Sequence, residues 1–156
     1  MITLCKTCGT SYTLHQDTPK HCIICEDDRQ YVPATGQEWI TPATLNASHT
    51  NKWKQISPTL LTLESVPRFA IGQRAFLVMT PEGNILWDCI ANLDEATRTI
   101  ITALGGLKAI AISHPHYYST MQDWAEAFNA PVYLHADDRA WIMRQSPYIH
   151  LWEGES

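Results

Sequence analysis

The second half of the chain alternates between short apolar runs and longer segments of helical spacing. The apolar runs predict strands, at residues 59–63, 75–79, 85–87, 107–112 and 131–135. The helical spacing predicts helices, at residues 92–104, 120–128 and 137–143. Strand, helix and strand in this order imply a parallel crossover in an α/β sheet.

Local signals support these boundaries. The Pro81-Glu82-Gly83 stretch predicts a turn that joins two of the strands into a hairpin. Asn92 and Ser119 stand where helix-capping side chains are favoured, and Gly105-Gly106 ends the first helix. Residues 41–52 are polar and are expected to form a connecting loop.

Composition and charge narrow the class of protein. The chain has 156 residues, of which 45% are hydrophobic and 17% charged, as expected for a globular protein. A net charge of −5 and a pI near 5.7 argue against nucleic-acid partners, which favour basic surfaces. Neither a long apolar run nor an N-terminal signal segment is present, so we expect no membrane partner and a cytoplasmic location.

Four of the five cysteines form two Cys-x-x-Cys pairs, which are separated by thirteen residues. These are Cys5, Cys8, Cys22 and Cys25. Two such knuckles predict a ribbon with four thiolate ligands around one zinc ion. A closed shell of four ligands leaves no position for substrate, so this zinc would be structural. The alternatives are a redox dithiol and substitution of a ligand by His15 or His21.

The surroundings of the ribbon bear on its partner. Glu26-Asp27-Asp28 is acidic and argues against a phosphate backbone as ligand. We expect the ribbon to dock on the neighbouring domain through Tyr31, Val32 and Trp39. The fifth cysteine, Cys89, is interpreted as a small core residue.

His114 and His116 follow the predicted strand 107–112. Two residues apart on an extended chain, their side chains point the same way. Ligands of open α/β sheets gather at this end of the strands, and imidazole pairs suit a divalent metal. The alternative is two surface histidines in a loop. His135 also ends a strand, where a structural role competes with a ligand role.

From residue 58 onward, the chain resembles the first half of a metallo-β-lactamase-fold hydrolase. Ile85-Leu86-Trp87-Asp88 matches the family's strand with its terminal aspartate, and Ser113-His114-Pro115-His116 matches the start of its metal loop. The family's next aspartate and histidine fall on Tyr118 and Ser119. The resemblance implies that Asp88 orients the metal loop from behind the ligands; capping of the following turn is the alternative.

The expected architecture is α/β (α+β): the N-terminal half of a metallo-β-lactamase-like αββα sandwich preceded by a small zinc ribbon. Residues 1–40 would form the ribbon, 41–57 a linker and 58–156 the partial domain. Half a sandwich leaves a sheet face uncovered, so we expect self-association or a partner chain.

The resemblance implies metal-assisted hydrolysis of an ester, thioester or amide in a small-molecule substrate. A second zinc at His114 and His116 would lack further ligands in this chain. Tyr117 or, as the catalytic candidate, Tyr118 would donate a hydrogen bond to a substrate oxyanion, with packing over the loop as the alternative. The rival function is a catalytically inactive, zinc-stabilised binding or scaffold protein.

Overall fold

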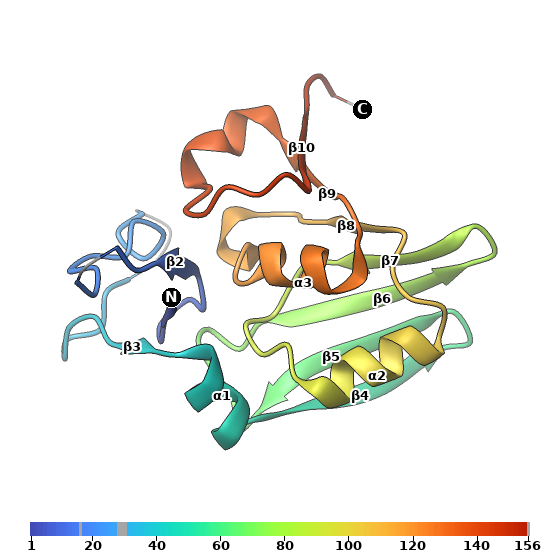
Figure 1. Ribbon diagram of the computed structural model, residues 1–156, viewed down its shortest axis with the longest axis horizontal. Coiled ribbons are helices and arrows are strands. Elements are labelled where there is room, and N and C mark those ends of the chain that lie inside the picture. The colour runs from blue at the N-terminus through green and yellow to red at the C-terminus, as the bar shows by residue number, and fades with distance from the viewer. Residues whose placement is uncertain (16, 28–30, 156) are drawn as a thin grey trace.

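The computed structural model describes residues 1–15, 17–27 and 31–155, so Asp28 and Ser156 lie outside the described residues. A seven-stranded sheet dominates the fold (Figure 1). Its strands are β4 (Thr50–Ser57), β5 (Leu60–Val66), β6 (Arg74–Thr80), β7 (Gly83–Trp87), β8 (Ala109–Ala111), β9 (Val132–His135) and β10 (Ile149–Trp152). They are ordered β10-β9-β8-β7-β6-β5-β4.

Two kinds of strand pairing meet at β7. Strands β4 to β7 form an antiparallel meander, and β7 to β10 are parallel, as the predicted crossover requires. A separate three-stranded antiparallel sheet contains the N-terminal segment. Its strands are β1 (Ile2–Cys5), β2 (Ser11–Thr13) and β3 (Trp39–Ile40), in the order β2-β1-β3.

The helices are short. They are α1 (Pro42–Ser48), α2 (Glu95–Ala103), α3 (Met121–Phe128) and the 3-10 helices η1 (Pro115–Tyr117) and η2 (Ala136–Trp141). Helices α2 and α3 lie together on one face of the large sheet (Figure 1). None of the helices in the described ranges is long and apolar enough to cross a membrane.

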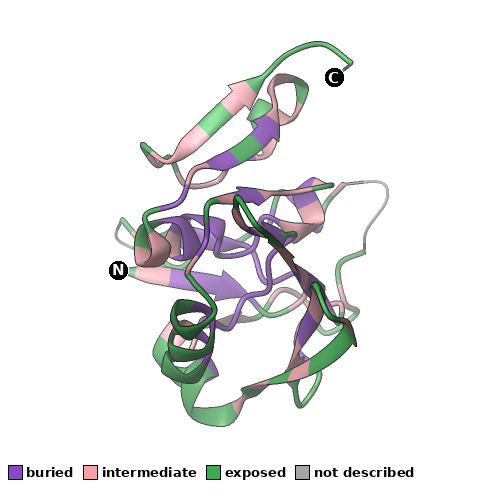
Figure 2. Ribbon diagram, turned by 90° about the vertical axis from the view of Figure 1, so that its right-hand side faces the viewer, coloured by how far each residue is buried: buried purple, intermediate pink, exposed green. Residues whose placement is uncertain are grey.

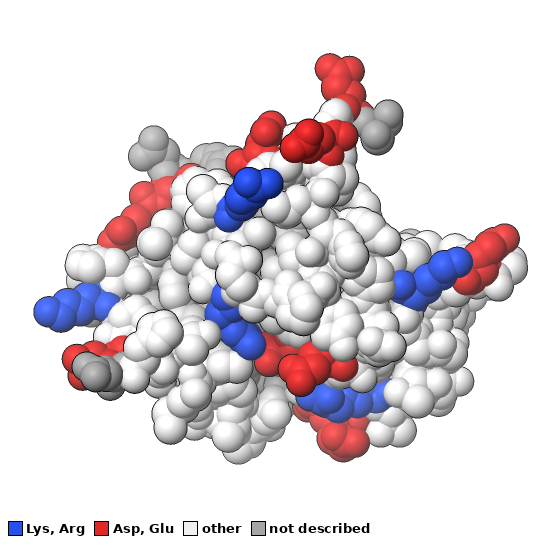
Figure 3. Space-filling model, turned by 45° about the horizontal axis from the view of Figure 1, so that its top comes forward, with Lys and Arg blue, Asp and Glu red and all other residues white. Residues whose placement is uncertain are grey.

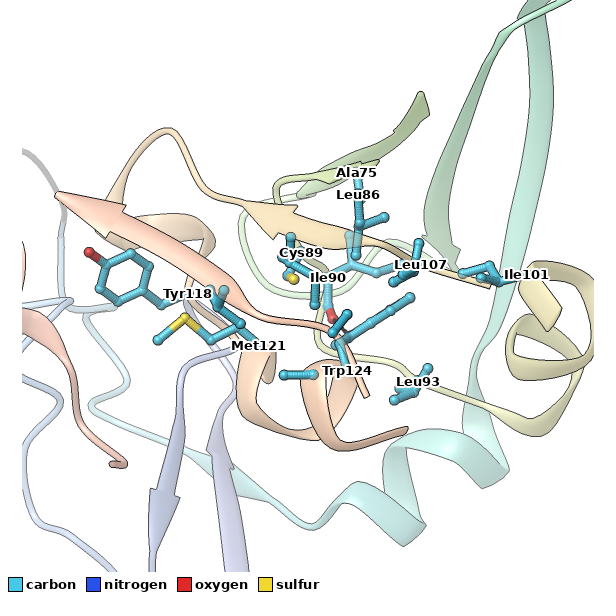
Figure 4. Packing of buried hydrophobic residues seen from close by; sticks show 14 of the residues in the cluster. Ala75, Leu86, Cys89, Ile90, Leu93, Ile101, Leu107, Tyr118, Met121 and Trp124 are labelled. Carbon is cyan, nitrogen blue, oxygen red and sulfur yellow. Dashed lines mark hydrogen bonds between the residues drawn. The ribbon is translucent and has the colours of Figure 1, made fainter. Parts of the chain in front are cut away.

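The main core lies between the helices and one face of the sheet. Leu77, Leu86, Ile110 and Val132 are in register on four neighbouring strands and are fully buried. The buried Trp124 of α3 packs against the same cluster (Figure 4). Figure 2 shows the buried residues gathered in the middle of the molecule. Cys89 belongs to this core, as predicted.

The opposite face of the large sheet carries aromatic side chains. Phe76, Trp87, Ala111 and Tyr133 are paired in register across four strands, each one residue away from the core row. Successive strand residues point to opposite faces, so this row faces away from the core. Trp87 is 45% exposed and Tyr133 is 44% exposed.

The structure corrects two of the expected elements. Residues 41–52 are not a loop: Thr41 caps α1 by accepting a hydrogen bond from Thr44 N, and the chain then enters β4. The predicted helix 137–143 is the 3-10 helix η2, which buries none of its described residues and so has no apolar face to hold a longer helix.

The predicted caps are also wrong. Asp94, not Asn92, caps α2 by accepting from Thr97 N, while Asn92 is fully buried at the junction with β4. Thr120 precedes α3 without a side-chain cap bond. Ser119 instead adopts a left-handed backbone with φ of +46° and bonds to the N-terminal segment.

Candidate functional site

The structure brings the four predicted thiol ligands together. All four cysteines are buried, and their sulfur atoms lie within 4.8 Å of one another. Cys5 Sγ is 3.6 Å from Cys25 Sγ, and Cys8 Sγ is 3.5 Å from Cys22 Sγ. A tetrahedral zinc with Zn–S bonds of about 2.3 Å places its sulfurs about 3.8 Å apart, so the cluster fits this ion closely.

Local backbone geometry produces the two knuckles. Cys5 ends β1, and its carbonyl accepts a hydrogen bond from Gly9 N at 2.8 Å. Gly9 has a φ of +77°, a conformation that glycine adopts at little cost. In the second knuckle, Glu26 N donates to Cys22 O at 3.1 Å. Each pair of cysteines is therefore held on one tight turn.

Tyr12 closes one side of the cluster. Its hydroxyl donates to Cys22 Sγ at 3.2 Å and accepts from Ile23 N at 3.1 Å. Burial raises the pKa of this phenol, so it stays a neutral donor. Hydrogen bonds within the cluster lower the pKa of the Cys22 thiol and raise the pKa of the Cys8 and Cys25 thiols, so Cys22 is the first of these three to form a thiolate.

The remaining predictions for the ribbon have different outcomes. His21 pairs with Glu26 at 2.8 Å, and neither His15 nor His21 joins the metal-binding group found among the described residues. Trp39 packs on the cysteines and meets Tyr12 edge-on, with ring centroids 5.3 Å apart. Tyr31 and Val32 are exposed, whereas Trp141 and Met143 from the second half of the chain pack against the cysteine cluster.

The structure also pairs His114 with His116. Their rings are stacked, with an interplanar angle of 5°, and the two Nδ1 atoms are 2.9 Å apart. His114 Nδ1 also accepts a hydrogen bond from His116 N at 3.2 Å, which tightens η1. The contact between the two Nδ1 atoms is a hydrogen bond in which one of them carries the proton. Both nitrogens would have to lose these bonds, and the rings would have to turn, before they could bind a zinc ion, whose nitrogen ligands lie about 3.3 Å apart.

Within the described residues, no third ligand of the His, Cys, Asp or Glu type joins this pair. The alternative ligand His135 is engaged elsewhere: its Nδ1 accepts from Asp137 N at 3.2 Å, and its Nε2 lies 3.1 Å from Gly154 O. The pair alone therefore offers two of the three protein ligands typical of a catalytic zinc.

Asp88 lies behind the loop that carries the histidines. Its Oδ1 accepts hydrogen bonds from Ser113 N at 2.8 Å and Ser113 Oγ at 2.9 Å, directly before His114. Burial raises the pKa of this carboxyl group, and the bonds from Ser113 oppose that rise. The contacts of Asp88 are thus to the loop expected to hold the metal.

Tyr118 occupies the core rather than the rim of the loop. Its side chain is 3% exposed and lies in the same cluster as Met121 (Figure 4). Burial raises the pKa of its phenol, so the hydroxyl stays protonated at neutral pH. This location agrees with the packing alternative, and its role toward a substrate stays a prediction.

One residue of the site was missed in the sequence. Gln73 immediately precedes β6, and its buried side-chain Nε2 donates to Cys8 O and to His116 O, both at 2.6 Å. It therefore joins the first cysteine knuckle to the histidine loop. The segment before β6 carries no motif or periodicity, so no sequence signal could have found it.

Comparisons with known proteins bear on the fold of the chain. No family model matches the chain. The uncharacterized protein YmaE of Bacillus subtilis (strain 168) is 46% identical over 155 residues, which are 98% of this chain. The chain spans only 57% of the length of YmaE.

Solved structures of metallo-β-lactamases are similar at partial coverage. The DIM-1 enzyme exposed to ceftazidime gives a TM-score of 0.50 at 14% identity over 67% of this chain and 52% of that chain. The enzyme from Erythrobacter litoralis in its mono-zinc form gives 0.42 at 18% identity over 57% and 46%. The likeness to DIM-1 confirms the predicted fold class, a mixed α/β structure of the metallo-β-lactamase type at partial coverage.

Proposed function

We propose that this chain is the metal-binding half of a zinc-dependent hydrolase of the metallo-β-lactamase type, with a structural zinc in its four-cysteine ribbon. The observation that carries the proposal is the stacked pair His114 and His116, with Nδ1 atoms 2.9 Å apart at the carboxyl end of β8. Open α/β sheets bind their ligands at this end of the strands.

Each residue of the proposed site has a distinct task. His114 and His116 supply two nitrogen ligands, and Asp88 holds the start of their loop through Ser113. A zinc ion bound there would lower the pKa of a coordinated water, which suits attack on the carbonyl of a small ester, thioester or amide. Tyr118 is buried in the core, so its neutral hydroxyl would reach a substrate only after the loop moves.

The remaining ligands must come from outside the described residues of this chain. A longer polypeptide or a partner chain would supply them, together with a second layer over the exposed face of the sheet. The length of YmaE, of which this chain spans 57%, supports a longer polypeptide as the source.

Zinc stoichiometry tests the proposal. In a calorimetric zinc titration at equilibrium, the chain is expected to bind one ion tightly and a second ion weakly, and the double variant His114→Ala, His116→Ala to bind only the first. His150→Ala removes an exposed imidazole on β10 and serves as the matched control, expected to keep both ions. A wild-type chain with one zinc, unchanged in the double variant, refutes the hydrolase proposal.

A second candidate function is a catalytically inactive, zinc-stabilised scaffold. It is favoured by one observation: within the part of the chain that the structure describes, only the four cysteines form a group of three or more metal ligands. It predicts the single, mutation-insensitive zinc. Nucleic-acid binding has less support, because basic side chains are scattered on the face seen in Figure 3 and the net charge is −5.

A further inference from the structure

The end of the histidine loop is bonded to the first cysteine knuckle, although the two lie more than a hundred residues apart in sequence. Ser119 O accepts hydrogen bonds from Ser11 N at 3.0 Å and from Ser11 Oγ at 2.8 Å. In return, Ser119 Oγ donates to Gly9 O at 3.3 Å. The loop that starts at Ser113 under Asp88 therefore ends on the cysteine ribbon.

Gln73 joins the two candidate metal sites more directly. Its side-chain amide has two N–H groups, and its two acceptors are the carbonyl of Cys8 and the carbonyl of His116, each at 2.6 Å. One acceptor belongs to a thiolate ligand of the ribbon, and the other to an imidazole of the pair. Gln73 is 5% exposed, so water does not readily replace its amide.

Gly9 allows this close approach. A Cβ atom at Gly9 would lie 3.0 Å from Gln73 Oε1 and 3.3 Å from Ser119 Oγ, and the φ of +77° already disfavours a side chain. The backbone of the knuckle thus packs directly on Gln73 and on the end of the histidine loop. A change in the shape of the knuckle would therefore alter its contacts with both.

We propose that Gln73 is a positioning residue that couples the filled four-cysteine site to the His114 and His116 loop, so that metal binding by the ribbon fixes the histidine pair. Without an ion, the first knuckle loses the tetrahedral restraint that sets the position of Cys8. The two carbonyl acceptors of Gln73 are then no longer held in fixed positions relative to each other. This inference rests on the metal site proposed for the ribbon and not on metal binding by the histidines.

Cadmium titration of the metal-free wild-type chain tests the coupling. Cd²⁺ is a soft ion that fills thiolate sites first, and sulfur-to-cadmium charge-transfer absorption follows that event. The ring nitrogen resonances of His114 and His116 in NMR spectra are expected to shift in proportion to the first equivalent. His150, on the distant strand β10, is the internal control and should stay in place. If the ring resonances of His114 and His116 do not shift with the first equivalent, or if the His150 resonance shifts with them, the coupling is refuted.

Two variants assign the coupling to Gln73. Gln73→Leu keeps the size of the side chain without its amide, and Gln73→Asn keeps the amide but shortens its reach. Each should take up the first Cd²⁺ as the wild type does, while losing most of the ring shift. Gln55→Leu makes the same change at an exposed position of β4 and should retain the full shift.

The outcomes separate this inference from the hydrolase proposal. Gln73 variants that behave like Gln55→Leu overturn the positioning role. Should a Gln73 variant fail to fold, the wild-type titration still decides whether the coupling exists, and Gln73→Asn decides the assignment. If the first equivalent moves the rings but a second does not bind them, the coupling stands and the hydrolase proposal fails.

Discussion

Asp88 places a carboxylate where burial makes it costly. It is 5% exposed and has a left-handed backbone with φ of +64°, a conformation in which aspartate and asparagine are enriched. Its hydrogen bonds to Ser113 recover only part of the cost of desolvation, and its pKa stays raised. An amide has nearly the same shape as the carboxyl group, so replacing Asp88 with asparagine tests what the charge contributes.

Asp88→Asn therefore separates stability from metal binding. A carboxyl group with a raised folded-state pKa stabilises the fold when protonated, and this contribution is lost as pH rises through that pKa. At pH 7, the variant should match or exceed the wild type in free energy of unfolding, and any advantage should disappear below about pH 4. Affinity of the histidine pair for zinc should fall about 10- to 100-fold.

Urea unfolding at both pH values, with wild type and variant compared at each, measures the first effect. Calorimetric zinc titration measures the second. A variant that is less stable at pH 7 but binds zinc normally would assign Asp88 to the fold alone.

Tyr118→Phe tests whether the hydroxyl does more than complete the core. The ring is almost fully buried beside Met121, and removing one oxygen from it should change the free energy of unfolding by less than about 1.5 kcal/mol. Tyr118→Ala should cost about 3–5 kcal/mol, because it leaves a cavity. Thermal unfolding measures both; a loss above about 2 kcal/mol in Tyr118→Phe would reveal a buried hydrogen bond of the hydroxyl.

At the scale of elements, patterns with a local cause were predictable. The strands β5, β6, β7 and β9 have compact apolar runs, and α3 has a clear apolar face. The edge strand β4 was missed because Trp53, its residue that packs against the main core, stands between two lysines. Only the tertiary pairing with β5 makes this segment a strand.

The residues of the candidate site also differ in whether the sequence predicted them. The four cysteines were predictable because the spacing within each knuckle is fixed by the geometry of one metal ion. The histidine pair was predicted from a period of two on an extended chain, but His116 lies in the 3-10 helix η1, so the two rings stack across a turn and not along a strand. Gln73 was not predictable, since its two acceptors come from segments 65 residues before it and 43 residues after it.

Chelation should act on one element of the fold and spare the other. The cluster around the four cysteines contains few other apolar side chains, so removal of zinc is expected to unfold the two knuckles, whereas Leu4 of β1 is also buried against Leu45, Phe69 and Ala91. The large sheet has its own core and should persist. Hydrogen exchange with and without a zinc chelator measures this: protection should be lost around the two knuckles and in β2 and retained in β6 and β7.

Cys8→Ser offers a chelator-free version of the same experiment, because it removes one thiolate ligand. Cys89→Ser is the matched control, as Cys89 is buried outside the cluster. Loss of protection across β6 and β7 in the chelated chain would contradict two independent cores.

On the scale of the whole molecule, the large sheet is covered on one face only by elements of the described chain. The row Phe76, Trp87, Ala111 and Tyr133 runs across its other face, and the outer strands β4 and β10 leave their far edges unpaired in the sheet order. Exposed apolar faces and open edges both favour association. We therefore expect the isolated chain to self-associate through this face, unless a longer polypeptide covers it.

The double variant Trp87→Lys, Tyr133→Lys should weaken this association at least about tenfold, because burying a charged amine in the interface costs more than 1.4 kcal/mol. Both positions are more than 40% exposed, so the fold should tolerate lysine there. Tyr31→Lys changes an exposed aromatic residue away from the large sheet and should leave association unchanged. Light scattering over a dilution series measures all three chains. A wild type that stays monomeric at every concentration would mean that the aromatic row is stable in water, and the argument for a missing second layer would lose its physical basis.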